Sequence, residues 1–302
     1  ALLAASPAYS EGTTVKWADA ADYTAIVLDR IGGIAGIDPT GGTWYMNKSD
    51  IDNLGSGAVP KEILWRGDKD NGKEDYAMGL SQEKDNYPPS LDGSGRINPT
   101  QNLVDAFPMA NGYPISDNVN SGYSENDPYK DRDPRLSNYV IYNGVKYGTG
   151  SKEIITGTYG INNDALNKDS ERSTRTGYYL RKLLRDDCNP NSQYNTAQYH
   201  YPVRIRFTEI FLAYAEAANE AWGPTGNGGH GYSAYDVIKA IRARAGVGAG
   251  NGDAYLESIK NDKDKLQELI RNERRIELCF ENRRFWGLRR WKANLNEPAR
   301  GM

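Results

Sequence analysis

The stretch from residue 62 to 90, EILWRGDKDNGKEDYAMGLSQEKDNYPPS, combines aromatic rings with carboxylates and a guanidinium group in a polar, glycine-containing context. An aromatic ring offers a flat apolar face to the C–H surface of a sugar, while charged and amide groups can hydrogen-bond to its hydroxyls. The stretch is therefore a candidate carbohydrate-binding loop that follows a short strand, and the alternative is an ordinary solvated loop with Trp65 packed beneath it. The candidate ligand-binding residues are Trp65, Arg66, Asp68, Asp70, Tyr76 and Tyr87.

Two further segments carry aromatic residues in loop-forming sequence. In GGTWYMN, Trp44 and Tyr45 follow two glycines, so this pair either stands exposed for a ligand or anchors the loop to the core. Tyr113, in ANGYPI, is the third candidate. Tyrosines number 21 against 5 phenylalanines, which favours wet binding surfaces over dry cores, because the hydroxyl keeps one end of the ring polar.

The acidic cluster Asp68, Asp70, Glu74 and Asp75 suggests calcium, but its spacing does not fit a helix-flanked calcium loop. Such a loop needs glycine at its sixth position, and Gly72 is the fifth residue counted from Asp68. We therefore predict no calcium site here.

The cysteines and histidines do not have the spacing of a zinc site either. Cys188 and Cys279 lie far apart, and only His200 and His230 are available to complete a ligand set. We predict no metal and no cofactor, and we favour two thiols over a Cys188–Cys279 disulfide.

No sequence feature selects a catalytic group. The 40 acidic residues provide many carboxylate pairs, but nothing singles out one pair for glycoside hydrolysis. A nucleophile elbow and a phosphate-binding glycine loop are both missing from the sequence. We therefore predict a protein that is not an enzyme, with a glycoside hydrolase as a less favoured alternative.

The segment RNERRIELCFENRRFWGLRRWK, residues 271–292, mixes arginines with aromatic residues and could be read as a nucleic-acid surface. The net charge of −3 gives no such footprint. Helical periodicity also places Glu273, Glu277 and Arg284 on the same face as the apolar side chains, where charges must be paired. The pattern predicts an internal carboxylate–guanidinium network and no nucleic-acid partner.

Helical periodicity outlines the elements that must position these residues. Residues 17–33 form a helix that ends at its two glycines, and residues 201–222 form a second one. A third helix opens with a Ser233/Asp236 capping box and pairs with the second as a hairpin. Residues 262–292 are predicted to form one continuous helix packed on that hairpin.

The middle of the chain, from 34 to 200, has a different texture. It is rich in Gly, Asn, Asp, Pro and Tyr, with short apolar runs (KEILWR, LSNYVIYN and TGYYLRKLL) that predict brief strands. One short helix is predicted from Pro99-Thr100 to Pro108. The chain has no apolar run of 18 residues or more, so we predict no membrane-spanning helix.

Six segments, taken in order, resemble the SusD/RagB outer-membrane nutrient-binding lipoproteins. They are NPTQNLVDAFPMANGYPI, NDPYKDRDPRLSNYVIY, TGYYLRKLL, YPVRIRFTEIFLAYAEAANEAWG, AIRARAGV and RNERRIELCFENRRFWGLRRW. The resemblance covers nearly all 302 residues, and six ordered segments are more specific than any one motif.

The resemblance implies a mostly α-helical fold, with a tetratricopeptide-like helical scaffold and an inserted loop-rich region that carries short strands. Residues 1–302 resemble the C-terminal portion of such a protein, without the N-terminal half. Residues 1–33 would be a scaffold helix, 34–200 the ligand-binding region, and 201–302 the helical hairpin with the arginine-rich helix.

The resemblance also implies a function. Such proteins bind an oligosaccharide or polysaccharide and deliver it to a SusC-like TonB-dependent outer-membrane transporter, from the extracellular face of the outer membrane, where a lipid anchor on the N-terminal part holds them. Some relatives bind peptides instead, which is the main alternative. Another alternative is a helical-repeat adaptor whose only partner is the transporter.

Overall fold

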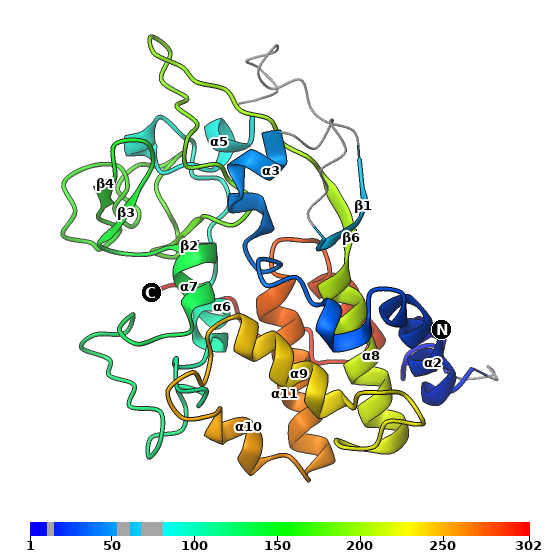
Figure 1. The fold of residues 1–302 in the computed structure, drawn as a ribbon. Coiled ribbons are helices and arrows are strands. Elements are labelled where there is room, and N and C mark those ends of the chain that lie inside the picture. The colour runs from blue at the N-terminus through cyan, green and yellow to red at the C-terminus, as the bar shows by residue number, and fades with distance from the viewer. Residues whose placement is uncertain (11–14, 53–60, 68–80) are drawn as a thin grey trace.

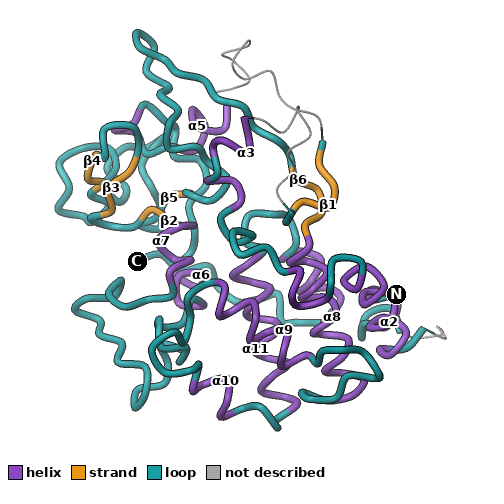
Figure 2. The backbone as a smooth tube through the Cα atoms, viewed as in Figure 1, coloured by secondary structure: helices purple, strands orange, loops and turns teal. Residues whose placement is uncertain are grey.

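The structure is a computed structural model that describes residues 1–10, 15–52, 61–67 and 81–302. The long helices gather in one part of the molecule, and a part dominated by loops and short strands lies beside them (Figure 1). Loops make up most of the second part, which Figure 2 shows in teal. The fold is mostly α, as the sequence predicted.

The helical part has one core shared by several helices. α8 (Phe207–Trp222) packs against α2 (Trp17–Asp29) through small residues, among them Ala21 and Ala25 on α2 and Ala217 on α8, all with no exposed surface. Small side chains allow the two backbones to approach closely. The same core takes in α9 (Ala234–Arg244), α10 (Ala254–Ser258) and α11 (Lys263–Glu277).

The predicted capping box at the start of α9 is confirmed. Ser233 accepts a hydrogen bond from the backbone N–H of Asp236, and the Asp236 carboxylate accepts one from the backbone N–H of Ser233. The helix ends at Arg244, and Gly246 follows with a φ of 84°, a conformation that glycine adopts without strain. α8 and α9 form the predicted hairpin.

The prediction of one continuous helix over 262–292 is wrong. α11 ends at Glu277, and α12 (Arg284–Arg290) starts after a break in which Phe280 and Asn282 have positive φ angles. The Lys182 ammonium group stabilises this break. It donates to the backbone carbonyls of Glu277 at 2.7 Å and Cys279 at 3.1 Å. These carbonyls would otherwise need the N–H groups of the next turn.

The loop-rich part contains short antiparallel strand pairs. β1 (Ile63–Arg66) pairs with β6 (Val203–Arg206), so residues that begin the predicted 201–222 helix are in fact a strand. β2 (Val140–Ile141) pairs with β5 (Tyr179–Leu180). β3 (Val145–Tyr147) pairs with β4 (Lys152–Ile154).

Several short helices precede β1 or lie between the strands. The predicted helix after Thr100 is confirmed as α6, with the Thr100 side chain accepting from the Leu103 N–H at its start. The segment LSNYVIYN, predicted as a strand, is the end of a helix followed by β2. The short helices are α1 (Leu2–Ala5), η1 (Gly33–Gly36), η2 (Trp44–Met46), α3 (Lys48–Asp52), α5 (Ser81–Asn86), η4 (Pro89–Leu91), α6 (Gln101–Ala106) and α7 (Pro134–Tyr139).

Two general predictions can be compared with the described part of the chain. Every helix in it is too short or too polar to cross a bilayer. No disulfide joins Cys188 and Cys279, and both side chains are buried.

Candidate functional site

A cleft of about 220 Å³ opens where the two parts meet. Its walls come from η2, from the segment that leads into β6, and from the linker between α11 and α12. Its lining includes both aromatic rings and charged groups. The lining residues are Trp44, Tyr45, Ile51, Gln82, Leu183, Arg185, Tyr199, His200, Tyr201, Pro202, Val203, Arg204, Phe280, Glu281 and Asn282.

The core holds the aromatic wall formed by Trp44 and Tyr45. Both side chains are buried, and their rings meet edge to face with centroids 5.9 Å apart. The Tyr45 hydroxyl donates to the backbone carbonyl of Asn138 at 2.9 Å, and burial raises the pKa of Tyr45 well above its usual value. Of the two alternatives that the sequence left open for this pair, burial favours the anchor, and both residues also line the cleft.

β6 contributes Val203 and Arg204 to the cleft lining, and β1 pairs with it. The Arg66 guanidinium lies over the ring of Tyr201, 4.8 Å from its centroid, and Tyr201 lines the cleft. Trp65, the neighbouring residue on β1, has 62% of its surface exposed. The Gly67 N–H donates to the carbonyl of Pro202 at 2.9 Å, which continues the pairing past the end of β1. A planar cation thus lies over an aromatic ring of the cleft lining, and an exposed indole precedes it on β1.

The charged groups in the cleft are fixed by partners. The Arg185 guanidinium donates to Asp187 at 2.9 Å and to Asp52 at 2.8 Å. The Glu281 carboxylate pairs with Lys182 at 2.6 Å and Arg206 at 2.9 Å. Burial alone would raise the pKa of Glu281, but these two cations outweigh it and hold the pKa below its usual range. The cleft therefore offers hydrogen-bonding groups in positions set before a ligand arrives.

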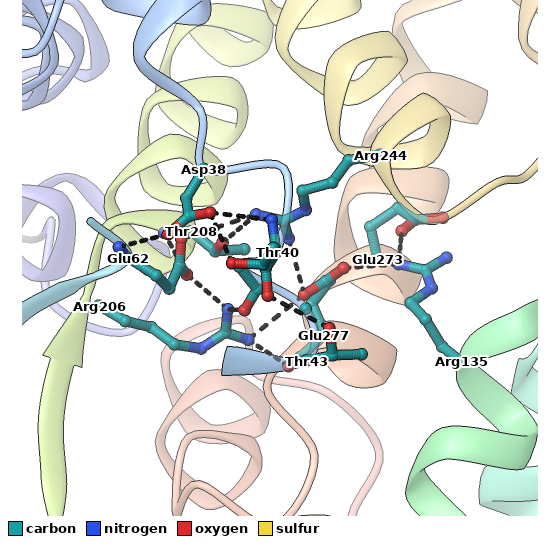
Figure 3. Close-up of polar contacts among 12 residues, drawn as sticks. Asp38, Thr40, Thr43, Glu62, Arg135, Arg206, Thr208, Arg244, Glu273 and Glu277 are labelled. Atoms are coloured by element: carbon teal, nitrogen blue, oxygen red, sulfur yellow. Dashed lines mark hydrogen bonds and ion pairs between the residues drawn. The ribbon is translucent and has the colours of Figure 1, made fainter. Parts of the chain in front are cut away.

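The ionic network behind the cleft contains both predicted carboxylates. Glu277 pairs with Arg135 at 3.0 Å, with Arg244 at 3.1 Å and with Arg206 at 3.3 Å (Figure 3). Its pKa is far below normal, because these guanidinium groups outweigh the opposing effect of complete burial. Glu273 pairs with Arg135 at 2.7 Å.

Arg284, the third predicted member, lies outside this network. It is half-buried on α12 beyond the helix break, and burial lowers its pKa. The break changes the helical phase, so a position that a continuous helix would turn inward no longer faces Glu273 or Glu277. The guanidinium groups come instead from Arg135 on α7 and from arginines on α9 and β6.

Two of the predicted binding residues lie elsewhere. Tyr87 has 1% of its surface exposed, and its hydroxyl donates to the backbone carbonyl of Arg185, so it is a core residue and not a ligand contact. Tyr113 is half-buried with its ring 5.6 Å from that of Tyr255, on the α10 side of the molecule. Three others, Asp68, Asp70 and Tyr76, lie outside the described residues.

The cleft also contains residues that sequence reasoning missed. Tyr199 and Tyr201 flank His200 in the segment AQYHYP, and Arg185 and Glu281 come from distant loops. The alternation of Tyr199 and Tyr201 was a usable signal, because side chains two positions apart in extended backbone face the same side.

Comparison with known proteins finds a matching family and similar structures. The SusD family model matches residues 61–300. A SusD-like carbohydrate binding protein of Bacteroides fragilis is 24% identical, with a TM-score of 0.63 over 91% of this chain and 48% of that one. Another SusD-like protein of the same species is 26% identical, with a TM-score of 0.60 over 91% of this chain and 51% of that one.

A curated relative agrees over a shorter stretch. SusD-like protein P38 of Formosa agariphila is 32% identical over 87 residues, which are 28% of this chain and 16% of the relative. The present chain spans about half the length of the two solved structures. Because the family model matches most of its residues, the chain belongs to the SusD family.

Proposed function

We propose that this chain is the glycan-binding portion of a cell-surface protein that captures oligosaccharides or polysaccharides and passes them to a SusC-like TonB-dependent transporter. It acts without catalysis. Family membership supports the transporter partner and a lipid-anchored position on the extracellular face of the outer membrane. The carbohydrate ligand agrees with the name of the similar carbohydrate binding protein of Bacteroides fragilis.

One observation carries the choice of ligand class. The exposed Trp65 precedes Arg66 on β1, and the Arg66 guanidinium lies over Tyr201, which lines a cleft that holds prearranged charged groups. A sugar can place its C–H face on the indole while its hydroxyls reach the charged groups of the cleft. The groups are ordered before binding, which reduces the entropy that binding must overcome.

The test is isothermal titration of the full-length protein against a panel of plant and host polysaccharides. Saturable binding of at least one glycan, without release of new reducing ends, supports the proposal. Binding of peptides from a protein digest in preference to every glycan would favour the peptide-binding alternative, and release of new reducing ends would identify a hydrolase.

The first prediction concerns Trp65. We expect Trp65→Ala to weaken binding of the best glycan by about 5- to 10-fold, because an aromatic contact contributes about 1 kcal/mol beyond burial and tenfold is about 1.4 kcal/mol. Trp286→Ala is the matched control, since Trp286 is also 62% exposed but lies on α12 and not on β1. Equal glycan affinity of the wild type and the Trp65 variant would show that Trp65 does not contact the glycan.

A further inference from the structure

A buried triad of metal-ligand types lies next to the cleft. Glu83 comes from α5, Cys188 from the loop after β5, and His200 from the segment that leads into β6. One ligand atom of each residue lies within 4.8 Å of the other two. Their exposed surfaces are 0%, 1% and 7%, respectively, so the three donors share an enclosed space.

The Glu83 carboxylate is only half satisfied. Its Oε1 atom accepts from the backbone N–H of Arg185 at 2.9 Å and lies 3.0 Å from His200 Nε2. Its Oε2 atom is buried, and no N–H or O–H group of the described residues donates to it. An oxygen in this position costs free energy unless a donor or a cation faces it.

The guanidinium group of the neighbouring Arg185 serves other groups. The Arg185 guanidinium is turned to Asp187 and Asp52, and it offers Glu83 only its backbone N–H. The triad therefore combines a carboxylate oxygen with a sulfur and an imidazole nitrogen, and no guanidinium or ammonium group of the described residues pairs with Glu83. Such a donor set is suited to a divalent cation.

We propose that Glu83, Cys188 and His200 bind a divalent cation of the zinc type. Sulfur, nitrogen and oxygen donors together select zinc over calcium and magnesium, which take oxygen ligands. In a tetrahedral site the ligand atoms are about 3.3–3.8 Å apart, as follows from metal–ligand distances of about 2.0–2.3 Å. Separations of at most 4.8 Å therefore need only small side-chain movements. The Cys188 thiol releases its proton to solvent as it binds.

The cation joins three segments that are distant in sequence. His200 lines the cleft, and Arg185, three residues before Cys188, lines it as well. A cation held by the triad thus fixes one wall of the cleft, and its role is structural. This inference does not depend on the identity of the ligand that the cleft binds.

The test uses Co²⁺ and Zn²⁺ as probes on the chelator-treated full chain. We expect one Co²⁺ per chain, with the near-ultraviolet charge-transfer band that a cobalt–thiolate bond produces, and displacement of that band by Zn²⁺. Cys188→Ser is expected to lose the band, whereas Cys279→Ser keeps it, since Cys279 is a buried thiol outside the triad. Absence of the band from the wild type overturns the proposal, as does its persistence in the Cys188 variant.

A second pair of variants covers failure of the cysteine variant to fold. His200→Gln is expected to weaken Zn²⁺ binding by more than about 100-fold, because even changes beyond the ligands cost about 10- to 100-fold. His230→Gln leaves affinity unchanged, since His230 is outside the triad and pairs with Asp22 on α2. Wild-type protein should also melt at a higher temperature with Zn²⁺ than with chelator, and equal melting temperatures would contradict the proposal.

Discussion

At the scale of single residues, buried charge is the dominant feature of this molecule. Glu277 has no exposed surface and faces three guanidinium groups. An isolated buried carboxylate would be costly, and removing it would leave the arginines without their partner in a low-dielectric interior. Its role is therefore best measured by a variant that keeps the shape and removes the charge.

Glu277→Gln should lower the free energy of unfolding by about 3–5 kcal/mol, the range found when one partner of a buried ion pair is removed. Urea unfolding followed by circular dichroism measures it. Glu257→Gln is the control, because Glu257 pairs with Lys239 at the surface and exposed pairs contribute little. If both variants lose equal stability, the buried ion pairs of Glu277 contribute no more to the free energy of unfolding than an exposed pair does.

Some of these residues could be predicted from the sequence, and others could not. Helical spacing was enough to place Glu273 and Glu277 in the interior, because the periodicity of one helix determines which face each side chain lies on. For Tyr87 the sequence left both directions open, since an aromatic residue in a loop can turn inward or outward. The proposed metal ligands escaped detection because Glu83 and Cys188 share no local spacing.

At the scale of elements, the end of α11 depends on a residue from another part of the fold. Lys182 lies in the loop-rich part, yet its ammonium group donates to two carbonyls at the end of this helix and to the Glu281 carboxylate at 2.6 Å. A cation at a helix C-terminus is favourable because the free carbonyls there carry partial negative charge. The contact sets the direction of the linker that lines the cleft.

Lys182→Met should therefore destabilise the protein by about 2–4 kcal/mol, because buried carbonyls and part of the Glu281 charge lose their donor. We also expect faster amide exchange in the linker between α11 and α12, which hydrogen-exchange mass spectrometry detects. Lys146→Met, at an exposed position on β3, is the control. Unchanged exchange in the linker would show that other contacts hold it.

The elements were predictable where local signals agree. α2, α8 and α9 carry strong periodicity, and α9 adds its capping box and closing glycine. The break after α11 was hidden, because the donor that stabilises it is 95 residues away from Glu277 in the chain. β6 was also missed, since its pairing with β1 comes from tertiary structure.

At the scale of the whole molecule, the ionic network joins the two parts of the fold. Arg135 on α7 belongs to the loop-rich part and pairs with Glu273 and Glu277 on α11 in the helical part. Figure 3 draws Arg135 reaching these two carboxylates. Because the same charges hold both parts, we expect the two parts to respond to acid together.

This arrangement predicts a loss of stability at low pH. The pKa values of Glu216, Glu273, Glu277 and Glu281 are all held below normal in the folded state, because paired cations outweigh burial. A depressed folded pKa gives stability that is complete above the unfolded value, about 4.3 for glutamate, and is lost as the pH falls toward the folded pKa. Each unit of depression contributes about 1.4 kcal/mol.

At alkaline pH the relevant pKa values are shifted in the opposite direction. Burial raises the pKa of many tyrosines, among them Tyr45 and Tyr139, so the stability they contribute is complete below their unfolded pKa of about 10 and declines as the pH rises above it. The urea concentration at the unfolding midpoint should therefore be constant from about pH 5 to 9 and fall at lower and at higher pH.

One acid transition should be seen by two probes. Near-ultraviolet circular dichroism follows the tyrosines of the loop-rich part, and the far-ultraviolet helix signal follows the helical part. Two separate transitions would mean that the Arg135 pairs do not couple the parts.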